Sequence, residues 1–478
     1  MLFSSISFIF YFLPAVLLCY FIVPARFRPV RNAILLVFSL VFYGFGGPKF
    51  LFVMLFSILV NYAFGLAVWH TQGQKQHDRS KILLAISVVC NLAVLCYYKY
   101  TNFFLSNIYA VLGREFEILD IVMPIGISFF TFQGLSYVVD VYRGTAKVQK
   151  NPLDVALYIS MFPQLIAGPI VRYETVAEQI GHRKEGVDLF ASGIRRFSVG
   201  LGKKVLIGNT MGLIAEQSFG HEMTSLSTAT LWLGMAAYTL HIYYDFSGYS
   251  DMAIGLGRMF GFEFLENFNY PYISKSITEF WRRWHISLST WFRDYVYIPL
   301  GGNRCSKIKW IRNIAVVWLC TGFWHGASWN FICWGLYFGV LLLLEKFWLG
   351  AILKRMPGWM QHIYAMLLIM FGWVLFNSAD MTAAMDYFVG LAGIGTGCLL
   401  DKQFLYLLLE YKVELVLAII AALPWKTAVV QRMKQARYPA LMQNIGTLGA
   451  NVCTFALLGL SVVVLVNSSF NPFIYFRF

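Results

Sequence analysis

Charged side chains are scarce in this sequence of 478 residues. Asp, Glu, Lys and Arg make up 13% of the chain, whereas apolar types make up 58% and aromatic types 18%. Soluble domains carry about 25% charged residues, so water is not the main solvent of this chain. The shortage argues against an ordinary soluble enzyme and predicts a protein embedded in a membrane.

The motifs of common soluble enzymes are also missing. No GxSxG elbow and no HExxH pair occurs, and GLGKK at residues 200–204 lacks the spacing and the Ser or Thr of a P-loop. The eight cysteines stand singly, most of them inside apolar runs, without a CxxC pair. This pattern indicates small buried side chains, and it predicts neither a disulfide framework nor a metal site.

Long apolar runs recur along the whole chain. The clearest are Leu51–Val68, Ile82–Tyr98, Ile314–Trp324, Phe331–Leu344 and Val452–Val466. A helix needs roughly 20 residues to cross the hydrocarbon layer, and lipid cannot satisfy the edges of an open sheet. With the shorter and interrupted runs, the pattern predicts an all-α polytopic protein with about ten to twelve membrane-embedded helices, some re-entrant. No linker divides it, so residues 1–478 are expected to form a single membrane domain.

The net charge of +14 is spread over loops. Basic residues crowd three of them, at Arg26–Arg31, Lys75–Lys81 and Lys426–Arg437. The positive-inside rule predicts that these loops face the cytoplasm, so that residues 1–5 and the tail after Val466 both lie outside. Positive charge dispersed in this way fits membrane topology and argues against nucleic-acid binding.

Other segments do not read as lipid-facing spans. Pro and Gly residues break the runs at residues 121–139 and 155–171. At membrane depth such breaks are tolerated only where protein or a water-filled cavity satisfies the freed backbone groups. Asp245 and Asp251 lie in a third such region. They are predicted to face a polar interior and to serve a structural role, by pairing with an Arg or by capping a half-helix.

His325, in TGFWHGASWN, is the most informative single residue. No Asp, Glu, Lys or Arg occurs from Asn313 to Leu344, and His325 falls near the middle of that stretch. Burial there disfavours the charged imidazole and leaves a neutral base, which suits abstraction of a hydroxyl proton. Gly322 and Gly326 would let another backbone or a substrate approach. The alternative is a hydrogen-bonded interior histidine that ties two helices together.

A second polar block reads FWRRWHISLSTWFRDYVYIPLGGNR. His285 follows Arg282 by three residues and precedes Ser289 by four, which predicts one shared helical face. Arg282 and Arg283, with Asp294 nearby, would form a cationic rim whose guanidinium groups match the phosphates of a CoA thioester. The alternative is an arginine cluster paired with Asp294 and with lipid phosphates.

These two blocks resemble the membrane-bound O-acyltransferase family, in its bacterial alginate O-acetyltransferase branch. The similarity extends to PIGISFFTFQGLSYVVDVYRG, FPQLIAGPI, DFSGYSDMAIG and the terminal FNPFIYFRF, and covers nearly the whole chain. It implies that His325 matches the catalytic histidine of the family and His285 a second, usually cytoplasm-proximal polar position. It also implies a ring of helices around a funnel and a narrow tunnel.

The resemblance further implies an acetyltransferase in the cytoplasmic membrane of a bacterium. Acetyl-CoA would be the donor substrate, with no bound cofactor. An alginate-like polysaccharide outside would be the final acceptor, reached directly or through an SGNH-type partner. His325 would accept the hydroxyl proton, and His285 would position the thioester or stabilise the oxyanion. Arg282, Arg283, Trp324, Ser289 and Asp294 are expected to contact substrate.

Two kinds of alternative remain open. The same family includes enzymes that acylate lipid or peptidoglycan, or teichoic acid with D-alanine. The LGGNR end of the His285 block and the FIYFRF tail favour the exopolysaccharide branch over these. A polysaccharide exporter or flippase would also have broken helices around a polar interior. It would not need a neutral histidine within a span.

Overall fold

The protein is all-α, as predicted. The computed structural model describes residues 1–478 except 167, 436–438, 469, 473 and 475–478. The described residues contain no β-strand, and an isolated bridge joins Ser227 and Cys398. Part of the FNPFIYFRF tail, one residue of FPQLIAGPI and Arg437 of the last basic loop lie outside the described residues.

The chain forms two compact units of discontinuous sequence. One contains Met1–Phe197 and Met252–Leu265, and the other Ser198–Asp251 and Glu266–Phe478. Helices α9 (Val187–Gly202) and α11 (Thr228–Met259) contribute residues to both. The expectation of a single membrane domain stays a prediction.

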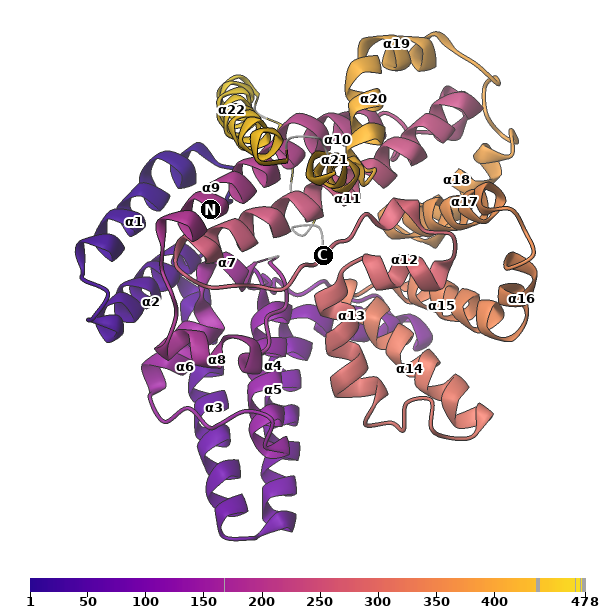
Figure 1. Ribbon diagram of the computed structural model, residues 1–478. Helices are drawn as coiled ribbons and strands as arrows, with labels where there is room; N and C mark the ends of the chain where they lie inside the picture. Colours follow the sequence, from indigo (N-terminus) through magenta and orange to yellow (C-terminus); the bar gives the residue numbers. More distant parts are fainter. Residues whose placement is uncertain (167, 436–438, 469, 473, 475–478) are drawn as a thin grey trace. The chain divides into compact units, whose positions relative to one another are not determined.

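The first unit contains the earlier helices (Figure 1). They are the π-helix η1 (Phe8–Phe12), α1 (Leu13–Ile22), α2 (Arg28–Gly44), α3 (Pro48–Gly73), α4 (His77–Val111), α5 (Ile127–Arg143), α6 (Pro152–Ser160), α7 (Phe162–Leu165) and α8 (Tyr173–Gly181). The predicted breaks are present, because α5 begins only after Gly126, which has a φ of 73°, and α6 ends before the separate short helix α7.

Helices α3, α4 and α5 pack side by side (Figure 1). Asn61 of α3 and Asn91 of α4 exchange side-chain hydrogen bonds of 3.0 Å, which pairs two polar groups between long apolar helices. Gly134 of α5 lies against Asn61, where a Cβ atom would collide with the amide. Gly134 therefore does not break α5 but allows its close approach to α3.

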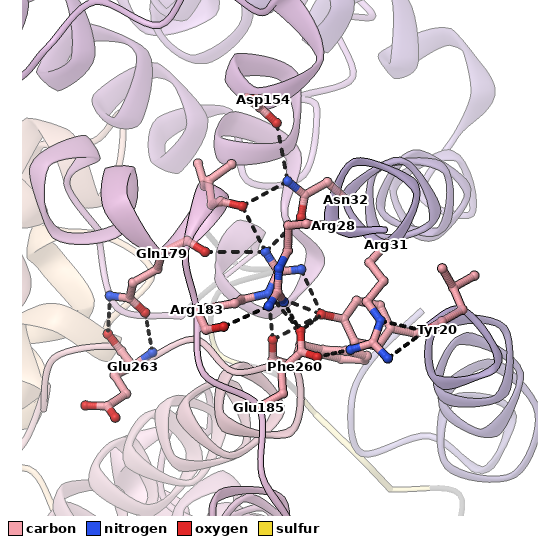
Figure 2. A network of polar contacts seen from close by, with 12 residues as sticks. Tyr20, Arg28, Arg31, Asn32, Asp154, Gln179, Arg183, Glu185, Phe260 and Glu263 are labelled. Carbon is pink, nitrogen blue, oxygen red and sulfur yellow. Dashed lines mark hydrogen bonds and ion pairs between the residues drawn. The ribbon is translucent and has the colours of Figure 1, made fainter. Parts of the chain in front are cut away.

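A buried polar network surrounds Glu185 (Figure 2). Arg28 and Arg31 form ion pairs with its two carboxylate oxygens, and Tyr20 donates to it. Arg183 donates to Tyr20 Oη at 2.7 Å and lies 3.4 Å from the same carboxylate. Two of the three arginines predicted to lie in the first basic loop, Arg28 and Arg31, are therefore structural residues at the start of α2.

The second unit contains the later helices. They are the π-helix η2 (Lys203–Gly208), α10 (Asn209–Glu216), the 3-10 helices η3 (Met223–Ser225) and η4 (Pro271–Ile273), α12 (Ile277–Arg283), α13 (Ile286–Phe292), the π-helix η5 (Arg293–Tyr297), α14 (Lys307–His325), α15 (Trp329–Leu344), the π-helix η6 (Glu345–Leu349), α16 (Gly350–Leu353), α17 (Gly358–Asn377), α18 (Met381–Leu391), α19 (Lys402–Glu410), α20 (Lys412–Ala421), α21 (Trp425–Lys434) and α22 (Pro439–Asn467).

Within the described residues, five helices are long and apolar enough to cross a bilayer. They are Pro48–Gly73, His77–Val111, Trp329–Leu353, Gly358–Asn377 and Asn444–Asn467. Phe8–Ile22 is apolar but shorter. The chain is thus a multi-pass membrane protein, and the larger number of ten to twelve embedded helices stays a prediction.

Asp245 and Asp251 form internal ion pairs. Lys204 Nζ lies 2.6 Å from Asp245 Oδ1, and both side chains are almost fully buried. Lys203 Nζ lies 2.8 Å from Asp251 Oδ2. The predicted structural role is confirmed, with lysines as partners where an arginine was expected.

Candidate active site

Aromatic side chains fill the interior around α12, α14, α15 and α17. Ring centroids are 4.7 Å apart for Trp281 and Trp318, and 4.8 Å apart for Trp284 and Trp373. Trp334, at the centre of this cluster, is fully buried. Large rings of this kind bury much apolar area and prefer the tilted and edge-on packing seen here. They form a rigid apolar frame for the polar side chains among them.

His325 is the last residue of α14, not the middle of a span. Residues 326–328 form a turn, and α15 begins at Trp329, so α14 and α15 make a helical hairpin (Figure 1). Gly326 and Ser328 both have extended backbone angles, which ends one helix and starts the next. The mid-span prediction was wrong, but the predicted burial is confirmed, because the residue is 8% exposed.

The glycines near His325 bring α14 and α15 together. A Cβ atom on Gly322 would collide with the backbone carbonyl of Phe331, and one on Gly326 with the Phe331 ring. Asn330, in the same motif, donates from Nδ2 to the carbonyl of Ser378 at 2.8 Å. The motif TGFWHGASWN therefore fixes the turn after His325 against both α15 and the end of α17.

Three rings surround the imidazole of His325. Its centroid lies 4.9 Å from that of Trp324, 5.0 Å from Trp334 and 5.1 Å from Phe376, with interplanar angles of 80° or 81°. These edge-to-face contacts hold the ring in one orientation. They also enclose it among aromatic side chains.

His285 lies between two short helices. Its φ of 43° and ψ of 55° are left-handed, an uncommon conformation for a residue other than glycine. The chain turns there, so Arg282 ends up on α12 and Ser289 on α13. The prediction of one shared helical face was wrong. Strained backbone of this kind clusters at functional sites, which makes His285 a stronger candidate.

The His285 imidazole is buried and held by polar partners. It is 1% exposed, its Nδ1 lies 3.1 Å from Asn267 Oδ1, and Ser287 Oγ lies 3.5 Å away. Burial lowers the pKa of this imidazole, which lies outside the five candidate spans, to about 3. The ring is therefore neutral at physiological pH.

Trp324 joins the two histidines. Its ring centroid lies 5.9 Å from that of His285 and 4.9 Å from that of His325. The structure thus brings together three residues that the sequence placed in one site, although 40 positions separate the two histidines in the chain. Two buried imidazoles with an indole between them suit acyl transfer to a hydroxyl.

The other predicted substrate contacts lie further out. Arg282 is exposed, whereas Arg283 forms an ion pair of 2.9 Å with Glu279. Asp294 pairs with its neighbour Arg293 at 2.6 Å. Ser289 Oγ donates to the carbonyl of Trp281 at 3.5 Å. These contacts leave Arg282 as the more available of the two predicted phosphate ligands.

Sequence reasoning missed two residues that shape the site. Asn267 bonds His285, and Glu345 accepts hydrogen bonds from the backbone of Ile277 at 2.6 Å and of Thr278 at 2.8 Å. Glu345 therefore holds the N-terminus of α12, the helix that leads to His285. Its signal was a single carboxylate directly after an apolar run of 14 residues, Phe331–Leu344. Asn267 stands in a polar loop and gave no comparable signal.

Comparison with known proteins identifies the family of this chain. The sequence model of the membrane-bound O-acyltransferase family matches residues 145–379. A relative named probable alginate O-acetylase, from Azotobacter vinelandii, is 40% identical and aligns over the full length of both chains. A peptidoglycan O-acetyltransferase from Helicobacter pylori is 36% identical over 84% of this chain and 82% of its own.

A more distant relative aligns with about half of this chain. The teichoic acid D-alanyltransferase of Bacillus subtilis is 34% identical over 48% of this chain and 60% of its own. Both histidine blocks lie inside the segment that the family model matches. The chain belongs to the membrane-bound O-acyltransferase family and is a multi-pass membrane O-acyltransferase.

Proposed function

We propose that this protein transfers an acetyl group from acetyl-CoA, used on the cytoplasmic side, to O-acetylate an alginate-like polysaccharide outside the cytoplasm. The observation that carries the proposal is the pair of buried histidines in contact with one tryptophan. Relatives named alginate O-acetylase that align over the whole chain support the acetyl group and the acceptor.

Acyl transfer from a thioester to a hydroxyl needs a general base and a group that positions the thioester. The hydroxyl oxygen of the acceptor attacks the thioester carbonyl, and His325 takes the hydroxyl proton. The tetrahedral intermediate collapses, the carbon–sulfur bond breaks, and an ester and a free thiol result. Proton return from His325 to the leaving thiolate restores the neutral base. No external oxidant, reductant or metal is required.

The surroundings of His325 support the role of base. Its three aromatic neighbours hold the imidazole in one orientation, which suits proton transfer from a positioned hydroxyl. His285 contacts the same Trp324 from the other block and is placed to orient the thioester or the attacking hydroxyl. Arg282, on the exposed side of α12, would bind CoA phosphates.

The immediate acceptor has two forms within this proposal. It is either the sugar hydroxyl itself or a hydroxyl of an SGNH-type partner outside the cytoplasm that passes the acetyl group on. The protein would work in the inner membrane of a bacterium, with the donor inside and the acceptor outside. Peptidoglycan is the second candidate acceptor, because a relative with that activity in its name matches more than four-fifths of the chain.

A transfer assay tests the proposal. Membranes containing the protein would receive radiolabelled acetyl-CoA together with alginate or with peptidoglycan fragments, each with and without a co-expressed SGNH-type protein. Label in alginate is the expected result, and membranes with His325→Ala are the control. Label in peptidoglycan alone would change the acceptor. Absence of any transfer from acetyl-CoA, while another acyl thioester is used, would overturn the donor.

A further inference from the structure

The side chain of Asn267 contacts His285 and the start of α13 at once. Asn267 Oδ1 accepts hydrogen bonds from Ser287 N at 3.1 Å and from Ser287 Oγ at 2.9 Å, and lies 3.1 Å from His285 Nδ1. Its backbone carbonyl accepts from Ile286 N at 2.9 Å. Asn267 thereby satisfies the first two amide groups of α13, which have no partner within that helix.

These contacts fix which nitrogen of His285 carries the proton. The backbone N–H of Ser287 can only donate, so the atom of Asn267 that faces it is the amide oxygen and not the nitrogen. That oxygen can only accept, so His285 Nδ1 carries a proton and donates it. Because the ring is neutral, Nε2 keeps its lone pair.

The imidazole of His285 lies among aromatic rings. Within the part of the chain that the structure describes, no group hydrogen-bonds His285 Nε2, which is buried. The rings against this imidazole belong to Phe246, Phe268 and Trp324, with centroids 4.6, 6.4 and 5.9 Å away. None of these neighbours, and neither of its polar partners Asn267 and Ser287, carries a charge. A buried acceptor that lacks a donor is costly, so Nε2 suits a donor brought by a ligand.

We propose that Asn267 is a positioning residue that keeps His285 protonated on Nδ1, so that Nε2 accepts a hydrogen bond from an O–H or N–H group of a substrate. The inference rests on the proposed acyl transfer and refines one part of it. A lone pair on Nε2 cannot donate to an oxyanion, so His285 acts as an acceptor and not as the oxyanion donor.

The donor group has two possible sources, and kinetics distinguish them. If it is the attacking hydroxyl, loss of the Nε2 acceptor lowers kcat with an unchanged KM for acetyl-CoA. If it is an amide N–H of the pantetheine arm, the KM for acetyl-CoA rises instead. Both outcomes support an acceptor at Nε2.

A double-mutant cycle tests whether Asn267 works through His285. Asn267→Ala alone should lower kcat/KM by at least about 10-fold. This is part of the loss in rate that follows when a catalytic acid or base is removed. In a His285→Ala background the same change should alter it by less than about 2-fold, because the residue it positions is gone. Additive losses in the double variant would overturn the inference.

Asn267→Asp is the conservative variant and keeps the test decisive if the alanine variant does not insert. An aspartate retains an oxygen for Ser287 N and for His285 Nδ1. It should keep activity within about 10-fold of the wild type at alkaline pH. Its negative charge favours the imidazolium, so the acid side of the pH–rate profile should move upward by about one pH unit or more.

Ser276→Ala is the matched control. Ser276 Oγ accepts from Glu279 N at 3.0 Å and caps α12, so this variant removes a helix cap without touching His285. It should stay near the wild-type rate. An Asn267→Asp variant as impaired as Asn267→Ala, or with an unshifted acid side, would overturn the acceptor role. A wild-type protein that transfers no acetyl group would overturn the proposed function instead.

Discussion

At the scale of single residues, the burial of His325 fits both a structural histidine and a general base. A substitution by glutamine distinguishes these two roles. A glutamine keeps one donor and one acceptor at similar reach, so a structural histidine should tolerate His325→Gln at a cost of about 1 kcal/mol. A general base cannot be replaced in this way, because an amide does not accept a proton at neutral pH. His325→Gln and His325→Ala should lower acetyl transfer by about 10² to 10⁴ in rate.

The measurement is acetyl transfer in membranes, normalised to the amount of inserted protein, with melting in detergent as the test of folding. His362→Gln is a suitable control, because the Nδ1 atom of that histidine lies 3.1 Å from the carbonyl of Ser274, outside the paired histidines. It should remain active. Near-normal activity of His325→Gln would move the role of base to His285.

The two neighbouring arginines should respond differently to removal. Arg282 is exposed, whereas Arg283 pairs with Glu279. If Arg282 binds CoA phosphates, Arg282→Ala should raise the KM for acetyl-CoA by about 10-fold and leave kcat nearly unchanged. Arg283→Ala, the control, should mainly lose a partly exposed ion pair worth about 0.5 kcal/mol. Titration of acetyl-CoA in initial-rate assays checks this, and an unaltered KM in Arg282→Ala would contradict it.

The sequence singled out both histidines as candidates, because an ionisable group is conspicuous among apolar residues, whereas Trp324 was expected from the family resemblance. Asn267 was not identifiable. It lies 18 residues before His285 in a loop that already contains polar residues, and only the fold brings the two together. Arg28 and Arg31 show the reverse case, since their basic character suggested a loop in solvent, yet both pair with the buried Glu185.

At the scale of helices, the apolar runs predicted where the helices lie better than where each helix begins and ends. The stretch from Asn313 to Leu344 lacks charge throughout, so its pattern did not reveal the turn at residues 326–328. That turn is made of Gly, Ala and Ser, which are small enough to resemble helix-packing residues. The break at His285 was likewise hidden, because its cause is a hydrogen-bond network with a distant asparagine.

The C-terminal segment is attached to a buried ion pair. Asp245 Oδ2 accepts from the backbone N–H of Ile474 at 3.0 Å, and Lys204 Nζ donates to the carbonyl of Pro472. Lys204 also donates to Asn209 Oδ1 at 2.7 Å. One pair of opposite charges therefore joins α11, η2 and the residues after α22.

Removing one charge of this pair should be strongly destabilising. Asp245→Asn leaves Lys204 buried without a counter-charge, which should cost about 3–5 kcal/mol in the free energy of unfolding. The double variant Lys204→Met, Asp245→Leu should recover part of that loss, because it leaves no buried charge. Melting in detergent measures both.

The pair of Lys203 and Asp251 provides the control. Lys203 is 24% exposed, so water relieves part of the cost when Asp251→Asn removes its partner, and the loss should be smaller. A melting temperature of Asp245→Asn equal to that of the wild type would show that this pair does not secure the segment.

At the scale of the whole molecule, composition and the lengths of the apolar runs were enough to predict the class, an all-α membrane protein. It did not determine the division into two compact units. Residues 252–265 belong to the first unit although the sequence on both sides belongs to the second. No linker marks either end of residues 252–265, so Pro-, Gly- or Ser-rich stretches could not reveal these boundaries.

The structure also shows that some basic residues are better evidence for the membrane topology than others. Arg28 and Arg31 are engaged by Glu185, so they are weaker evidence for a cytoplasmic loop than free basic residues would be. Lys75, between α3 and α4, and Arg79 and Lys81, near the start of α4, are exposed. The loop at Lys75 therefore carries most of the prediction for the N-terminal part of the chain.

Labelling of introduced cysteines tests this orientation in intact cells. The exposed native cysteines, Cys19, Cys96, Cys320, Cys398 and Cys453, would first be replaced. Lys75→Cys and Lys434→Cys, at the end of α21, should resist a membrane-impermeant maleimide until the cells are permeabilised, because the positive-inside rule places both basic segments in the cytoplasm. Ser468→Cys, just after α22, should react at once. A tail outside and a loop at Lys75 inside require an odd number of crossings between them. Labelling of Lys75→Cys in intact cells would therefore contradict the predicted orientation.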